Sequence, residues 1–202
     1  LRVTAIDRLK DNDSMVAYEK LAAELNVLPE IDYERVTLMK WEYLKAVFLQ
    51  SGKKTLNSSG FKEFFKANRE WLEPYAAYCC LRDIYETPDF RKWKMYSVFN
   101  PDDIAEFCAC GNIYYDKVSF YYFVQYHLHI QLLEVRDYAH AKGIVLKGDI
   151  PIGVSRDSVD AWSHPKLFYM DSQAGAPPDD FSVEGQNWGF PTYNWDETTH
   201  PH

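Results

Sequence analysis

Apolar side chains recur at the three- and four-residue spacings of helices through residues 1–142. Before residue 87 the pattern predicts four helices: one around Leu21 that ends at Pro29, one from Val36 that Gly52 and the polar run LNSSG end, one that starts at Phe61, and one with Pro74 in its first turn. Residues 87–116 mix Pro, Asn, Gly and aromatics, so loops and short helical turns are expected there. This part of the chain is therefore predicted to be predominantly helical.

The clearest predicted helix runs from about Val118 to Ala141. One apolar stripe follows it at helical spacing: Phe120, Val124, Leu128, Leu132, Val135 and Ala139. Its first half is apolar on more than this stripe, so that half is expected to be covered on both sides.

A helix stop and an apolar run follow this helix. Gly143 is a natural stop, and IVLKGDIPIGV opens like a strand buried in a parallel sheet. Helix, glycine, strand and acidic loop together predict an α/β fold. Asp149 would lie near the carboxyl end of the strand, where α/β folds gather binding groups, which favours a functional role for it.

Regular periodicity stops after Val154, yet aromatics remain abundant. The run AGAPPDDFSVEGQNWGFPTYNW, residues 174–195, is predicted to be an ordered loop region. It combines flat apolar faces with hydrogen-bonding groups; the faces are Phe181, Trp188, Tyr193 and Trp195, and the polar groups are Asp179, Gln186 and Asn187. Sugars offer the matching C–H faces and hydroxyls. The alternative is a loop that packs its aromatics onto its own domain, and composition leaves both open.

Other candidate groups have structural interpretations. His127 and His129 lie two residues apart, so on a helix they point away from each other and cannot bind one ion; we expect their polar atoms to be satisfied in a packed interface. Asp157 and Asp160 fit turn formation or helix capping as well as a catalytic carboxylate pair, because spacing alone cannot show that two acids meet. The cysteines occur as CC and CxC: Cys79, Cys80, Cys108 and Cys110. This is a weak zinc pattern, so buried thiols are favoured, and neither a metal site nor a cofactor is predicted.

Charge and hydropathy limit the kinds of molecule that the chain could bind and the compartments in which it could act. The 202-residue chain has a formal net charge of -8, which argues against binding nucleic acid or anionic lipid. No apolar run approaches the roughly 20 residues of a membrane span, and residues 1–12 lack the apolar stretch of a signal peptide. A cytoplasmic location is therefore expected.

Two C-terminal motifs carry a family resemblance. GDIPIGVSRDSVDAWSHPKLF followed by AGAPPDDFSVEGQNWGFPTYNW resembles the 4-alpha-glucanotransferases called amylomaltases or disproportionating enzymes, glycoside hydrolase family 77. The upstream pieces IDYERVTLMKWEYLKAVF, FFKANREWLEPYA and FYYFVQYHLHIQLLEVRDYAHAKGI match in the same order, so the resemblance covers about residues 30–196.

The resemblance implies a retaining transglycosidase on a (β/α)8 barrel with a helical insertion. Residues 1–117 would form the insertion subdomain, and residues 118–202 a partial barrel of helix, strand and substrate loop. The glucan-contacting residues would be Asp149, Asp179, Phe181, Gln186, Asn187 and Trp188. Many members have Tyr where this chain has Asp180, so a ring contact from that position is not expected.

The family's catalytic groups are not matched within these 202 residues. The RIDHFRG-like nucleophile motif and the acid/base Glu are absent, so the chain is expected to be an inactive internal fragment that contacts the α-glucan donor and acceptor, such as a maltooligosaccharide or glucose. Strand edges left open by a partial barrel would be covered either by self-association or by extra helix packing. The alternative is a stand-alone, non-catalytic glucan-binding or interaction module.

Overall fold

The computed structural model describes residues 1–149 and 151–199. They divide into two compact units that interleave along the chain: residues 1–69 with 119–146 form unit 1, and residues 70–118 with those from 147 onward form unit 2. One junction falls beside the predicted boundary between residues 117 and 118, but helices α3 and α5 contribute to both units. The assignment of residues 1–117 to an insertion and 118–202 to a barrel stays a prediction.

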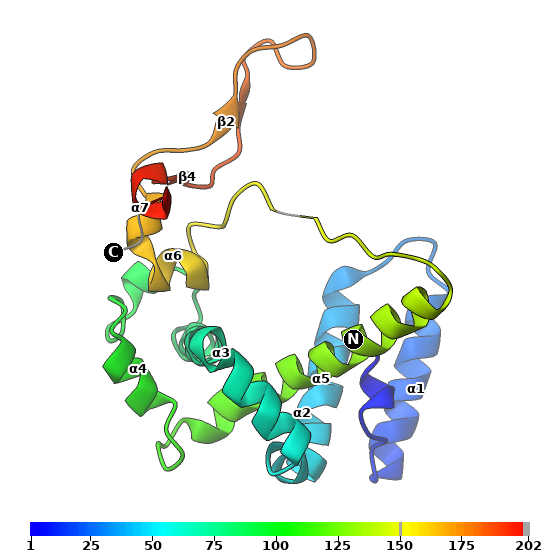
Figure 1. The fold of residues 1–202 in the computed structure, drawn as a ribbon. Coiled ribbons are helices and arrows are strands. Elements are labelled where there is room, and N and C mark those ends of the chain that lie inside the picture. Colours follow the sequence, from blue (N-terminus) through cyan, green and yellow to red (C-terminus); the bar gives the residue numbers. More distant parts are fainter. Residues whose placement is uncertain (150, 200–202) are drawn as a thin grey trace. The chain divides into compact units, whose positions relative to one another are not determined.

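Unit 1 is helical, and it contains η1 (Val3–Ala5), α1 (Asn12–Asn26), α2 (Tyr33–Leu56), the first part of α3 (Ser59–Tyr85) and most of α5 (Tyr115–Ala141). Helices α1 and α2 pack against each other (Figure 1). Aspartates cap both: Asp11 accepts from Ser14 N at 2.8 Å and Asp32 from Arg35 N at 3.0 Å.

Two predicted helix stops do not end their helices. Helix α2 continues through Gly52 and ends at Leu56, the first residue of the polar run LNSSG that was also predicted to end it. The Phe48 ring lies so close to Gly52 that an added Cβ would meet it at 2.5 Å. Glycine is needed there for close packing and does not end the helix. The predicted third and fourth helices are one helix, α3, with Pro74 inside it. Pro74 removes one backbone donor without ending the helix.

The first half of α5 is buried on every side, as predicted. All residues from Val118 to Val124 are at most 7% exposed. Aromatic rings of α2 surround this half: Phe48 lies 5.5 Å from Phe120 and 5.4 Å from Phe123. The stripe does not stay buried further along, because Leu132 and Val135 are exposed. The sequence pattern therefore predicted the burial of the N-terminal half of α5. It did not predict that the C-terminal part of the apolar stripe is exposed.

His127 corrects the expectation that both histidines are satisfied. Its side chain is buried, yet its Nε2 atom has no hydrogen-bond partner among the described residues. Burial lowers the pKa of His127 to about 4. His129 is exposed, with its ring 4.9 Å from that of Phe64.

Unit 2 is built around Trp162. It contains the rest of α3, η2 (Phe90–Lys92), α4 (Pro101–Phe107), α6 (Val159–Ser163), η3 (Pro165–Leu167) and α7 (Trp195–Thr199). The Trp162 ring contacts Tyr78 at 5.8 Å, Trp93 at 5.7 Å and Phe99 at 5.0 Å. Its indole nitrogen donates to Tyr96 O at 2.8 Å, so a ring from α6 both fills the core and satisfies its polar atom.

The cysteine expectation is met at three positions. Cys79, Cys80 and Cys108 are buried free thiols, whereas Cys110 is exposed. Burial raises the pKa of Cys80 to about 12, so this thiol keeps its proton at neutral pH.

The predicted strand after α5 is wrong for the residues described. Residues 144–149 are exposed and form no strand. A parallel strand is buried only when neighbouring strands pair with it and helices cover the sheet. The strands of the described residues are short and antiparallel, and all lie between residues 168 and 193. The described residues are thus predominantly helical, as expected, but show no parallel sheet. Among the same residues, no helix is long and apolar enough to cross a membrane.

Candidate functional site

The aromatic run from residue 174 is one part of a two-armed ribbon, not an irregular loop. Strand β1 (Phe168–Tyr169) pairs with β4 (Thr192–Tyr193), and β2 (Gly175–Ala176) pairs with β3 (Gln186–Asn187), both antiparallel. We call residues 168–193 the ribbon; β2 and β4 mark its two arms in Figure 1. The turn-rich composition concealed these pairings because each strand is only two residues long.

Side chains of the turn itself order the tip of the ribbon. Asp179 Oδ1 accepts from Phe181 N at 2.9 Å and from Ser182 N at 2.7 Å. Ser182 Oγ donates to Gly185 O at 2.6 Å, and Gly185 has a φ of +75°, which favours glycine. Phe181 projects from this turn and is 96% exposed. One Asp179 oxygen is therefore used in shaping the turn that presents Phe181.

Three predicted ligand residues lie together on the returning arm. Trp188 donates through its indole nitrogen to Gln186 Oε1 at 2.9 Å, and its side chain is 42% exposed. Asn187 Oδ1 accepts from Gly189 N at 2.9 Å. The Trp188 ring leans on Phe190 with the ring centroids 5.8 Å apart. These contacts fix the indole at the surface with its polar atom already satisfied.

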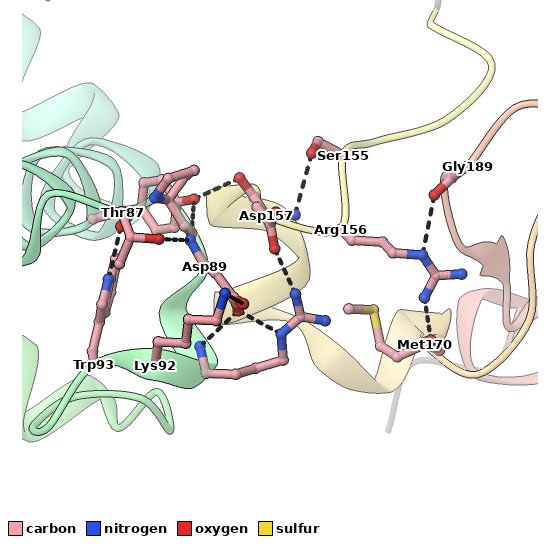
Figure 2. Close-up of polar contacts among 12 residues, drawn as sticks. Thr87, Asp89, Lys92, Trp93, Ser155, Arg156, Asp157, Met170 and Gly189 are labelled. Atoms are coloured by element: carbon pink, nitrogen blue, oxygen red, sulfur yellow. Dashed lines mark hydrogen bonds and ion pairs between the residues drawn. The ribbon is translucent and has the colours of Figure 1, made fainter.

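The segment before α6 holds the base of the ribbon. The Phe190 ring lies against Gly153, where an added Cβ would meet the ring at 2.3 Å. Arg156 donates through Nε to Gly189 O at 3.1 Å and through one terminal nitrogen to the carbonyl of Met170 (Figure 2). Its other terminal nitrogen donates to the carbonyl of Ser172. The sequence prediction missed these residues, because backbone carbonyls carry no signature in the side-chain pattern.

Asp157 connects the same segment to the helical part of unit 2. Its carboxylate pairs with Arg91 at 2.7 Å, and Arg91 also pairs with Asp89 at 2.6 Å (Figure 2). The hydrogen bond from Arg91 lowers the pKa of Asp89 below its usual range. The Tyr78 hydroxyl lies 2.5 Å from Asp157 O and 2.8 Å from Pro88 O, so one proton is shared between two carbonyls. Asp157 is thus a structural ion-pair residue.

The remaining predicted acids are placed separately. Asp149 is exposed in the segment that follows α5. Asp160 lies in the first turn of α6, which Ser158 caps by accepting from Ala161 N at 3.2 Å. No cluster of His, Cys, Asp or Glu in the described ranges could hold a metal ion.

The exposed Trp188 ring beside two amides and a carboxylate offers a flat apolar face and hydrogen-bonding groups on one surface. The sequence profile described as 4-alpha-glucanotransferase matches residues 2–201, so the chain belongs to that family. The match also takes in the first 30 residues, which the motifs alone did not reach.

Known relatives agree with the family. The chain is 48% identical over 168 residues to a 4-alpha-glucanotransferase of Oryza sativa subsp. japonica, covering 83% of this chain and 18% of the rice protein. It is 32% identical to the 4-alpha-glucanotransferase of Chlamydia muridarum, covering 94% of this chain and 36% of that protein. The structure resembles an amylomaltase from Streptococcus agalactiae in complex with acarbose, with a TM-score of 0.69 and 26% identity over 92% of this chain and 41% of that one. The chain therefore spans well under half of each of these relatives.

Proposed function

We propose that this chain forms part of the glucan-binding site of a retaining 4-alpha-glucanotransferase, which transfers α-1,4-glucan segments to a sugar acceptor. The observation that carries the proposal is the ribbon, on which Gln186 holds the Trp188 indole at the surface. Family membership supports it, and so does the acarbose bound to the amylomaltase of similar structure.

The proposed roles follow from the chemistry of each side chain. Trp188 and Phe181 stack on the C–H faces of glucose units, and Gln186 and Asn187 bond to hydroxyl groups. Asp179 offers its second carboxylate oxygen, since the first is used in the turn. Asp149 is proposed to hold the donor sugar near the bond that is cut. The partners are an α-glucan donor and a glucan or glucose acceptor, and no cofactor is assigned.

The covalent chemistry is proposed to need residues outside this chain. Retaining transfer requires a carboxylate nucleophile and a proton donor placed about 5 Å apart across the scissile bond. No RIDHFRG-like nucleophile motif occurs in the 202 residues. We therefore infer that residues 118–202 complete a barrel only together with further chain. A cytoplasmic location is proposed as well, and the free buried thiols of Cys79, Cys80 and Cys108 support it.

Purified by itself, the 202-residue chain is expected to release no glucose from maltotriose and to form no maltopentaose. Chromatography of the sugars after long incubation checks this, with a full-length 4-alpha-glucanotransferase as the positive control. Any disproportionation by the chain would show that it carries its own nucleophile.

Trp188→Ala in the full-length protein is expected to weaken transfer more than hydrolysis. Loss of one stacking face should reduce the transfer-to-hydrolysis ratio about tenfold, because water needs no aromatic platform. Trp71→Ala is the matched control, since Trp71 is 45% exposed and Trp188 42%. An unchanged ratio in Trp188→Ala would remove the ribbon from acceptor binding.

A stand-alone glucan-binding module is the second candidate, favoured by the exposure of Phe181 and Trp188. Titration of the chain with maltoheptaose, followed by tryptophan fluorescence, separates the two functions. A module should saturate at modest concentration, whereas half of a divided cleft should bind weakly.

A further inference from the structure

The two arms of the ribbon are not paired along their whole length. One antiparallel ladder joins Tyr169 to Thr192, and the next joins Gly175 to Asn187. Residues 170–174 and 188–191 lie between these ladders. Two backbone bonds cross this stretch, from Ala174 N to Phe190 O at 2.9 Å and from Trp188 N to Ala174 O at 3.0 Å. Trp188 therefore lies in a stretch where few backbone hydrogen bonds join the two arms, so strand pairing alone holds the arms together only weakly there.

The Arg156 guanidinium bridges this stretch. Its acceptors are the carbonyls of Met170 on the outgoing arm and of Gly189 on the returning arm (Figure 2), together with the carbonyl of Ser172 on the outgoing arm. Arg156 is half-buried, and in the described part of the chain no carboxylate pairs with it. The planar fork of arginine can reach several carbonyls at once, and such charge-assisted bonds are stronger than neutral ones.

The same segment is fixed on its other side. Gly153 receives the Phe190 ring, and Asp157 is held by Arg91 and by the Tyr78 hydroxyl. Burial raises the pKa of Tyr78 to about 12, so its hydroxyl remains a donor at neutral pH. Arg156 thus joins the ribbon to a segment anchored in the helical part of unit 2.

We propose that Arg156 is a positioning residue that sets the spacing of the two ribbon arms and, through Gly189, the orientation of the Trp188 indole. This rests on the proposed function in one respect, namely that Trp188 meets the glucan. Arg156 itself touches backbone carbonyls and acts on the sugar only through the ribbon. By holding the platform still before the acceptor arrives, it favours a sugar over water as acceptor.

Hydrogen exchange of the 202-residue chain tests the positioning without any sugar. In Arg156→Ala and Arg156→Lys, the amides of Ala174 and Trp188 should exchange about tenfold faster, because the local opening of the ribbon loses its charge-assisted bonds. Lysine keeps the charge but lacks the fork, so both variants should behave alike. Arg136→Ala is the control, since Arg136 is an exposed arginine that pairs with the adjacent Asp137 in unit 1.

Three results would overturn the positioning role. One is exchange at Ala174 and Trp188 that stays at the wild-type rate in both variants while circular dichroism shows intact helices. Another is full recovery by lysine, which would show that charge and not the fork is needed. A variant that loses its helices as well would also contradict the inference, because it assigns to Arg156 only the ribbon and not the helical core.

The functional consequence is measured in the full-length protein. Arg156→Lys should lower the transfer-to-hydrolysis ratio about fivefold and raise KM for the acceptor more than it changes kcat, since a misplaced platform is a binding defect. Arg136→Lys should leave both unchanged. Faster ribbon exchange together with an unchanged ratio would refute the proposed role of the ribbon in acceptor binding while upholding Arg156 as its support. An unchanged ratio together with unchanged exchange would refute the inference.

Discussion

At the scale of single residues, His127 lies between aromatic rings without a partner for its Nε2 atom. The Phe123 ring is 4.4 Å and the Tyr126 ring 5.5 Å away, measured between centroids. Burial disfavours the charged imidazolium and lowers the pKa of His127 to about 4. The folded state therefore binds fewer protons than the unfolded state between that value and the usual 6.5.

The chain is expected to lose stability as the pH falls through this window. Near pH 5 the loss due to His127 should be roughly 2 kcal/mol relative to pH 7. Urea unfolding at both pH values measures it, and His127→Leu should remove that part of the loss. His129→Leu, which changes an exposed neighbour, is the control. An equal pH effect in wild type and His127→Leu would contradict this assignment.

Residue types in the sequence identified the exposed side chains of the ribbon, but they did not identify the hydrogen bonds that hold these side chains in place. Trp188 and Gln186 stand out because rings and amides in a turn-rich run are unusual. Their mutual hydrogen bond and the three acceptors of Arg156 depend on backbone placement, which residue types alone do not determine. The only sequence feature that pointed to Arg156 was its place two residues after the GDIPIGV motif.

At the scale of elements, long periodic segments were predictable and short pairings were not. The early half of α5 is buried as its pattern indicates. The apolar run from Ile144 reads as a strand, but a strand requires partners that its own sequence does not supply. Pairing of β2 with β3 depends on Gly175, which lies against the backbone of Gln186.

Gly175→Ala is expected to open the distal part of the ribbon. An added Cβ would lie 2.1 Å from Gln186 O, and a backbone atom cannot move aside as a flexible side chain can. Exchange of the amides around Gln186 should become faster, and Trp188 fluorescence should shift to the red. Gly148→Ala is the matched control, because nothing lies within 4 Å of its added Cβ. Wild-type exchange in Gly175→Ala would show that the pairing tolerates a side chain there.

At the scale of the whole molecule, the chain exposes a short apolar segment after α5, residues 144–146. Ile144 is 56%, Val145 82% and Leu146 47% exposed, and Ile152 follows at 73%. Isolated apolar residues on a surface are common, but consecutive ones invite pairing with another chain. We propose that a second copy of this chain covers the segment at high concentration.

Sedimentation velocity over a range of concentrations should therefore show self-association of the chain. Val145→Lys should shift the chain to monomer by placing a charge in the apolar contact. Val98→Lys is the control, since Val98 is equally exposed at 82% but lies outside the segment. Association that persists in Val145→Lys would place the contact elsewhere.

The bond between Trp188 and Gln186 also fixes which hydrogen-bonding atoms the ribbon offers. Gln186 Oε1 already accepts from the indole and Asn187 Oδ1 from Gly189 N, so each amide oxygen keeps one lone pair while the N–H donors of both amides are the groups most open to a sugar. A sugar hydroxyl that meets them must act as acceptor. Replacing that hydroxyl by fluorine, which accepts weakly but cannot donate, should therefore lower the binding affinity less than replacing it by hydrogen. This arm of the ribbon would then recognise the lone pairs of the sugar hydroxyl and not its proton.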